Sequence, residues 1–111
     1  MNKAELQELK QKLVDLQTDL KVRLKDDEES SGVVELDQSR QGRLSRIDAL
    51  QAQEMARESA RRHRRELARV SAALERVEAG EYGDCVACGE EIDPRRLDID
   101  PAAARCIDCA R

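Results

Sequence analysis

Leucines recur along residues 3–24 with the spacing of an α-helix. The steps between them are 3, 4, 3, 4 and 4 residues, at Leu6, Leu9, Leu13, Leu16, Leu20 and Leu24. Such steps place side chains on one face of a helix. Asn2 stands before this stripe and Glu5 follows it by three residues, which is the spacing of a capping box at a helix start. The pattern predicts an amphipathic helix over residues 3–24.

An acidic, turn-forming segment interrupts this pattern at residues 26–37, in which Val33, Val34 and Leu36 are the apolar residues. Ser30, Ser31 and Gly32 are typical of a turn, and Asp37 is a suitable N-cap for a following helix. The segment holds six acidic residues and no basic one: Asp26, Asp27, Glu28, Glu29, Glu35 and Asp37. These acids form either a negative tip that meets a cationic site on a partner, or a solvated loop that only caps the next helix.

A second apolar stripe predicts a longer helix from about residue 39 to residue 79. Its steps are 4, 3, 4, 3, 4 and 3, at Ala56, Ala60, His63, Leu67, Val70, Leu74 and Val77. Leu44 and Ile47 begin the stripe in another phase, so we expect a phase change near residues 50–55, as in a coiled-coil stutter. His63 is interpreted as a seam residue, and Gly80 stands where a helix-ending glycine belongs.

Each stripe needs an apolar partner, and the economical solution is that the two helices cover one another. The predicted fold is therefore mainly α: an antiparallel helical hairpin, or coiled coil, over residues 1–80 with its tip near residues 26–37. A parallel dimer of the longer helix is the alternative. Because the first helix is the shorter one, we expect the C-terminal segment to cover the base near residues 67–77.

Composition narrows the class of protein. Of the 111 residues, 40% are charged, and Tyr82 is the only aromatic one. Such a chain lacks the bulk for a β-sandwich or for the walls of a buried catalytic pocket, so no enzyme activity is expected. The start of the chain lacks the apolar core of a signal peptide, and no stretch reaches about 18 apolar residues. We therefore expect a cytoplasmic protein with reduced cysteines and no membrane contact.

The last 31 residues, 81–111, contain all four cysteines of the chain. Cys85 and Cys88 form one Cys-x-x-Cys pair, Cys106 and Cys109 form another, and 17 residues separate the pairs. This spacing is typical of a closed tetrahedral zinc site, in which the metal is structural. The alternatives are iron in the same cage, disulfides, or a dithiol redox pair.

Residues 81–111 have few large apolar side chains, so metal binding should supply much of their folding energy. Asp93-Pro94 and Asp100-Pro101 each place a capping residue before proline, which predicts two short helical turns. Tyr82 is expected to pack against the first cysteine pair.

Arginine is concentrated in residues 57–69, where six arginines face two glutamates, a net charge of 6 − 2 = +4. One interpretation is a docking surface for an acidic protein patch or for phosphates, with Arg61 and Arg65 as candidate contacts. The other is helix solubility supported by Glu58–Arg62 and Arg62–Glu66 pairs. No aromatic residues alternate with the arginines, so base stacking and sequence-specific DNA binding are not expected.

The C-terminal residues resemble the zinc finger of the DksA/TraR family. The resemblance rests on Gly80-Glu81-Tyr82-Gly83-Asp84-Cys85-x-x-Cys88-Gly89-Glu90-Glu91-Ile92, then Arg96-Leu97, Pro101 and Cys106-Ile107-Asp108-Cys109. It implies a bacterial transcription regulator that binds RNA polymerase, with its hairpin in the secondary channel and acidic tip residues near the catalytic centre. It also implies one structural Zn²⁺, and ppGpp as a nucleotide with which some members act.

The tip departs from the family pattern, which is Asp-x-x-Asp-x-Ala. In the segment Asp37-Gln38-Ser39-Arg40-Gln41-Gly42 only Asp37 matches, because Arg40 replaces the second acid and Gly42 the alanine. Glu35 and Asp37 are therefore the candidate tip contacts. An alternative function is a zinc-stabilised helical adaptor that has the fold without the polymerase activity, and a nucleic-acid-binding zinc protein is a third.

Overall fold

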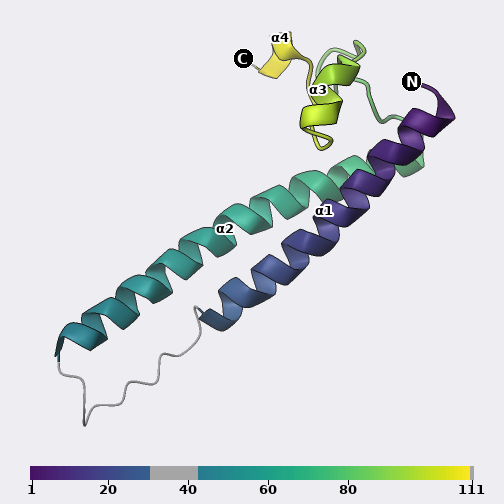
Figure 1. The fold of residues 1–111 in the computed structure, drawn as a ribbon. Coiled ribbons are helices and arrows are strands. Elements are labelled where there is room, and N and C mark those ends of the chain that lie inside the picture. Colours follow the sequence, from purple (N-terminus) through teal and green to yellow (C-terminus); the bar gives the residue numbers. More distant parts are fainter. Residues whose placement is uncertain (31–42, 111) are drawn as a thin grey trace. The chain divides into compact units, whose positions relative to one another are not determined.

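The computed structural model describes the backbone of residues 1–30 and 43–110 and the side chains of residues 1–29 and 47–110. In these residues the order of helices is α1 (Lys3–Ser30), α2 (Arg43–Ala79), α3 (Pro94–Ile99) and α4 (Ile107–Ala110) (Figure 1). An isolated antiparallel β-bridge joins Asp84 to Glu91. The fold is mainly helical, as predicted.

The chain forms two compact units, one of Met1–Asp19 with Leu67–Arg111 and the other of Leu20–Glu66. In the first unit, Lys10 Nζ lies 3.0 Å from Glu78 Oε1, and Gln17 Nε2 donates to Ser71 Oγ at 3.3 Å. The residue number falls along α2 as it rises along α1, so the two helices run antiparallel. The predicted hairpin pairing is confirmed.

The start of α1 has the predicted cap. The backbone N–H of Glu5 donates to Asn2 Oδ1 at 2.8 Å, and Asn2 Nδ2 donates to the Glu5 carboxylate at 3.3 Å. The first of these bonds satisfies a backbone donor that has no partner inside the helix, and the second joins the two side chains. The leucine stripe then packs as expected at most positions, with Leu13 fully buried and Leu9 and Leu20 nearly so, whereas Leu16 is 37% exposed.

The end of α1 differs from the prediction. The helix continues through the acidic residues 26–29 to Ser30, six residues beyond the predicted end at Leu24. The acidic run and the residues Ser30-Ser31-Gly32 indicated a turn there, and carboxylates at a helix C-terminus also oppose the helix dipole. Contacts between helices outweigh this effect within the second unit: Asp27 Oδ2 accepts a hydrogen bond from Ser59 at 3.2 Å and lies 2.5 Å from His63 Nδ1.

The stripe of α2 is confirmed from Ala56 onward, where Ala60 and Val70 are buried and His63 lies half-buried at the seam beside Asp27. Ile47 does not belong to the packed stripe, because its side chain is 46% exposed. Leu44 lies among residues whose side chains are not described, and the predicted start near Ser39 lies outside the described backbone.

The end of α2 is a Schellman cap. Gly80 has a φ of +74°, its N–H donates to the carbonyl of Val77 at 3.2 Å, and the N–H of Glu81 donates to the carbonyl of Arg76 at 2.9 Å. A left-handed backbone of this kind favours glycine. The helix therefore ends at Ala79, as the sequence predicts. None of the described helices combines the length and the apolar character that crossing a bilayer requires.

Candidate metal centre

The first cysteine pair lies in a tight turn after α2. The N–H of Gly89 donates to the carbonyl of Cys85 at 2.9 Å, and Gly89 has a φ of +77°. The N–H of Cys85 donates in turn to the carbonyl of Glu90 at 2.8 Å. These bonds fold the backbone back under the two sulfur atoms, at a position where a residue other than glycine would be strained.

The second pair lies at the start of α4. The N–H groups of Cys109 and Ala110 both donate to the carbonyl of Cys106, at 3.1 and 2.9 Å. This single turn directs the sulfurs of Cys106 and Cys109 to the same side. A hydrogen bond from Val86 N–H to the carbonyl of Ala104, at 2.9 Å, holds the first turn beside the chain that leads into the second.

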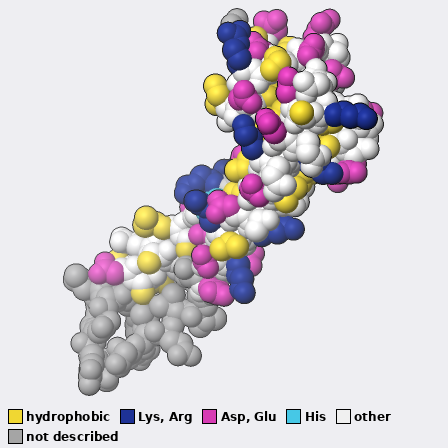
Figure 2. Space-filling model, turned by 45° about the vertical axis from the view of Figure 1, so that its right-hand side comes forward, with side chains coloured by type: hydrophobic (Ala, Val, Ile, Leu, Met, Phe, Trp, Pro, Cys, Tyr) yellow, Lys and Arg dark blue, Asp and Glu magenta, His cyan; other side chains and the backbone are white. Residues whose placement is uncertain are grey.

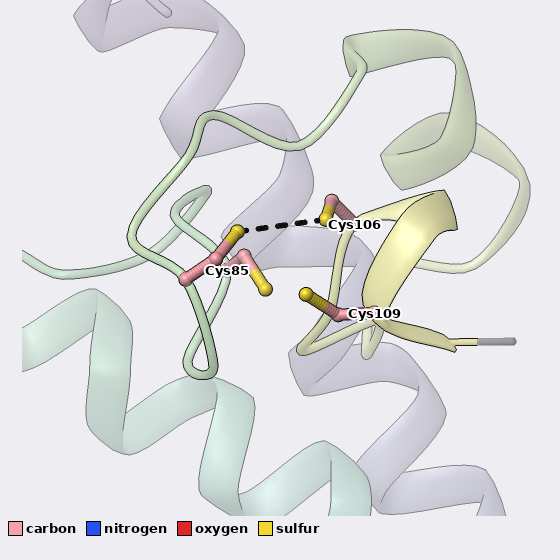
Figure 3. Close-up of side chains that lie close together, drawn as sticks. Cys85, Cys106 and Cys109 are labelled. Atoms are coloured by element: carbon pink, nitrogen blue, oxygen red, sulfur yellow. Dashed lines mark hydrogen bonds between the residues drawn. The ribbon is translucent and has the colours of Figure 1, made fainter.

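The four sulfur atoms converge on one point. All of them lie within 4.8 Å of one another, and the distance from Cys88 Sγ to Cys106 Sγ is 3.6 Å. Figure 3 shows the side chains of Cys85, Cys106 and Cys109 directed toward a shared centre. A tetrahedron with Zn–S bonds of about 2.3 Å has edges of about 3.8 Å, so the cluster has the size that zinc requires.

The electrostatics of the cluster also favour a cation. Backbone N–H donors, that of Cys106 foremost, lower the pKa of Cys85 to about 6. Hydrogen bonding to the thiols of Cys106, Cys88 and Cys85 raises the pKa of Cys109 to about 12. Thiolates this close together disfavour one another, and a cation between them removes that penalty. The four free cysteines fit one structural zinc ion, with four sulfur donors and no open position.

A small apolar core supports the sulfur cluster. Its buried members are Leu9 of α1, Cys85, Ile92, Leu97 of α3 and Ala103, against which Tyr82, Cys106 and Cys109 pack. The packing of Tyr82 confirms the sequence interpretation. Its hydroxyl donates to the carbonyl of Pro101 at 2.7 Å, and burial raises the pKa of Tyr82 to about 12.

The two predicted helical turns of this segment have different outcomes. Asp93 caps α3 as expected, since its Oδ1 accepts from the N–H of Arg95 at 2.9 Å and Pro94 is the first helical residue. Asp100-Pro101 starts a turn rather than a helix, closed by a bond from Ala103 N–H to the carbonyl of Asp100 at 3.0 Å. Asp100 instead pairs with Arg69 of α2 at 2.7 Å, so the C-terminal segment does contact α2 near its base.

The candidate partner-binding residues lie elsewhere. Glu35 and Asp37 fall outside the described residues. Arg61 and Arg65 are exposed on α2 in the second unit, and Arg61 lies 2.6 Å from Glu58 and 3.7 Å from Glu54. Glu58 thus pairs with Arg61, three residues on, rather than through the Glu58–Arg62 spacing that the sequence suggested.

Sequence reasoning missed the contacts of Asp27 with Ser59 and His63. All three residues were visible in the sequence, but only the pairing of α1 with α2 brings them together. The lone histidine on an apolar stripe was the available signal that a polar partner must face it.

Comparison with known proteins identifies the C-terminal segment. Residues 80–111 match the family model of the prokaryotic dksA/traR C4-type zinc finger. The segment is therefore a C4 zinc finger of the DksA/TraR type, as the resemblance indicated.

Similarity to individual proteins extends beyond the finger. The chain is 42% identical over 48 residues to the RNA polymerase-binding transcription factor DksA of Haemophilus influenzae, a match that covers 43% of this chain and 33% of that protein. The protein of the same name from Escherichia coli also matches at 42% over 48 residues, with 32% of its length covered. The match thus spans about a third of these relatives.

The fold has a solved counterpart. The structure of transcription factor DksA2 from Pseudomonas aeruginosa superposes with a TM-score of 0.80 and 22% identity, covering 99% of this chain and 83% of that one. At this identity the likeness establishes the fold alone, and the long helical pair is part of it.

Proposed function

We propose that this protein is a transcription regulator that binds RNA polymerase by protein–protein contact. The 48-residue match to proteins named RNA polymerase-binding transcription factors is the observation that carries this proposal. The helical pairing supports it, because a long hairpin suits insertion into a narrow channel such as the secondary channel of the polymerase. A cytoplasmic location follows from this function.

In the proposed organisation, residues 1–80 form the hairpin and residues 81–111 form the finger. Cys85, Cys88, Cys106 and Cys109 hold one Zn²⁺, and the convergence of their sulfurs within 4.8 Å supports this assignment. The zinc ion in this proposal is structural rather than catalytic: it cross-links the chain, and four thiolates fill its coordination shell. The finger stabilises the base of the hairpin through the core around Leu97 and the pair between Arg69 and Asp100.

The proposed contacts with the polymerase are of two kinds. Glu35 and Asp37, with the acids at the end of α1, carry negative charge toward the catalytic centre. Arg61 and Arg65 meet acidic residues along the channel wall. The nucleotide ppGpp is the first small effector to test, because the family resemblance implies it for some members.

Competitive binding to core RNA polymerase tests this function. Labelled, zinc-loaded protein is titrated with bacterial core polymerase, and a known secondary-channel factor is then added as competitor, with and without ppGpp. We expect saturable binding that the competitor displaces. Absence of binding at micromolar polymerase, or binding that the competitor leaves unchanged, would contradict the proposal.

The adaptor alternative has one specific observation in its favour, the replacement of the second tip acid by Arg40 and of the tip alanine by Gly42. An adaptor that retains the docking surface would bind core polymerase but leave transcription unchanged. Multiple-round transcription from a promoter that responds to a secondary-channel factor separates the two functions. A change in transcript yield with added protein favours the regulator, and binding without such a change favours the adaptor.

A further inference from the structure

An open groove lies between α1 and the finger, within the first unit. It consists of two adjoining hollows, of about 450 and about 290 Å³. One wall is the face of α1 from Glu5 to Asp19, and the other is formed by α3 and the residues after it, from Pro94 to Pro101. Lys12 lines both hollows. We call this surface the α1–finger groove.

The centre of the α1–finger groove is apolar. Leu16 and Ile99 face each other across the larger hollow, and Leu9 contributes to the smaller one. Ile99 is 87% exposed, the highest value among the large apolar side chains that the structure describes, and Leu16 is 37% exposed. The folded chain therefore leaves most of the apolar surface of Ile99 available for contact with another molecule.

The edges of the α1–finger groove are acidic. Five carboxylate side chains and one ammonium group line the two hollows, a side-chain charge of 1 − 5 = −4. The acids are Glu5, Glu8, Asp15, Asp19 and Asp98, and the base is Lys12. In the upper part of Figure 2, exposed hydrophobic side chains lie among Asp and Glu side chains. Such a surface attracts cationic groups at its edges and apolar groups at its centre.

The single base of the groove is held weakly. Lys12 Nζ lies 3.7 Å from Asp98 Oδ1, and the two side chains are 51% and 70% exposed. Exposed pairs of this kind contribute little to stability. The finger is held instead by its buried core around Leu97. A cation of a partner can therefore replace Lys12 at Asp98 without disturbing the finger.

Several ligands fit this combination poorly. The carboxylates repel the phosphates of nucleic acid and of anionic lipids. The acids are also spread along α1 rather than gathered around one point, and among the described residues only the four cysteines converge closely enough to hold a metal ion. From Glu5 to Asp19 the wall rises by about 1.5 Å per residue, which gives about 21 Å in all. An amphipathic helix of about four turns has this length, and its apolar face can enter such a groove.

We propose that the α1–finger groove binds a basic amphipathic helix of a partner protein. Apolar side chains of that helix contact Leu16 and Ile99, and its lysines or arginines lie against the carboxylates of both walls. This inference goes beyond the proposed function, because the polymerase contacts proposed above lie at the hairpin tip and on α2. The groove gives the protein a second binding surface, with a partner other than the polymerase.

The test uses a labelled synthetic peptide as the probe and fluorescence anisotropy as the readout. The peptide has about 14 residues, with leucines spaced three and four residues apart and lysines on either side of them. A second peptide has the same composition in scrambled order. Both are titrated with the zinc-loaded protein at low salt and at 0.15 M salt, about the physiological ionic strength.

Matched variants locate the binding. Leu16→Ser combined with Ile99→Ser removes the apolar centre, and Ile99→Ser alone does so at a side chain that folding scarcely uses. The control is Val14→Ser combined with Val86→Ser, two exposed residues of the same unit outside the groove.

A second pair of variants addresses the charge. Glu8→Gln combined with Asp15→Asn removes two acids of the groove. Its control is Glu75→Gln combined with Glu81→Gln, which changes the net charge equally at exposed positions outside it. Circular dichroism confirms that each variant retains the wild-type helicity.

We expect saturable binding of one peptide per protein, about tenfold weaker in the Leu16→Ser, Ile99→Ser variant, with the controls within about twofold of wild type. The Glu8→Gln, Asp15→Asn variant should bind more weakly at low salt and depend less on salt. Equal binding of the scrambled peptide, or groove variants that bind like the wild type, would overturn this inference. Displacement of the peptide by core polymerase would overturn it by assigning the groove to the polymerase interface. Self-association of the protein alone, abolished by Leu16→Ser with Ile99→Ser, would overturn it in favour of a second copy.

Discussion

Two neighbouring apolar residues of α3 should differ sharply in their contribution to stability. Leu97 is fully buried in the core beside the sulfur cluster, whereas Ile99, two residues on, is 87% exposed. Burial of a leucine side chain contributes about 1.5–3 kcal/mol. Truncation also leaves a cavity, and Leu→Ala changes in cores cost about 2–5 kcal/mol. We expect about 3 kcal/mol for Leu97→Ala and within about 0.5 kcal/mol for Ile99→Ala.

Urea unfolding of the zinc-loaded protein measures both variants, with the fluorescence of Tyr82 as the signal. Tyr82 is the only aromatic residue and packs against this core, so its emission reports the finger directly. Because metal binding is coupled to folding, Leu97→Ala should also weaken zinc binding, by about a hundredfold for 3 kcal/mol. Equal midpoints for the two variants, or unchanged zinc affinity in Leu97→Ala, would refute the assignment of this core.

Three further predictions concern the finger and its junction with α2. Cys88→Ser should abolish stoichiometric zinc binding and make residues 81–111 sensitive to protease; retained zinc and resistance would show that the metal does not hold this segment. Tyr82 should ionise near pH 12 in the zinc-loaded protein and near its ordinary pKa of 10.0 after chelation, measured by tyrosinate absorbance. Because the folded pKa is the higher one, this contribution to stability is complete below about pH 10 and is lost as the pH rises through about 12; identical titrations would contradict burial of the phenol. Gly80→Ala should cost about 1 kcal/mol from its φ of +74° alone, since no atom lies within 4 Å of the added methyl group; a neutral effect in thermal unfolding would contradict the cap.

Local rules were sufficient for much of the fold. The leucine spacing, the Asn2 cap, the Gly80 stop and the Asp93-Pro94 helix start each depend on residues within one or two turns, and each was predictable. The cysteine cluster was predictable for a similar reason. Each Cys-x-x-Cys turn is a local motif that brings two sulfur atoms together, and two such pairs supply the four ligands of a tetrahedral metal site.

Features that depend on contacts between distant segments were not predictable. Predicting where α1 ends required knowing that Asp27 contacts Ser59 and His63 of α2. Predicting that Ile47 and Leu50 are exposed required knowing how α2 is rotated about its own axis. That rotation is set by packing contacts elsewhere along the helix. Asp100 has the sequence of a helix cap but pairs with Arg69, so tertiary contact overrode the local signal.

The central proposal, that the hairpin binds RNA polymerase with its acidic tip toward the catalytic centre, is tested most directly by site-specific crosslinking. A photo-crosslinking residue replaces Asp26, exposed near the end of α1, and in a second variant replaces Glu90, exposed in the finger. With zinc-loaded protein and core polymerase, the account predicts crosslinks from position 26 to the secondary channel near the catalytic centre, and from position 90 only to the outer rim. Crosslinks from position 26 confined to the polymerase exterior, or channel crosslinks from position 90 alone, would contradict it.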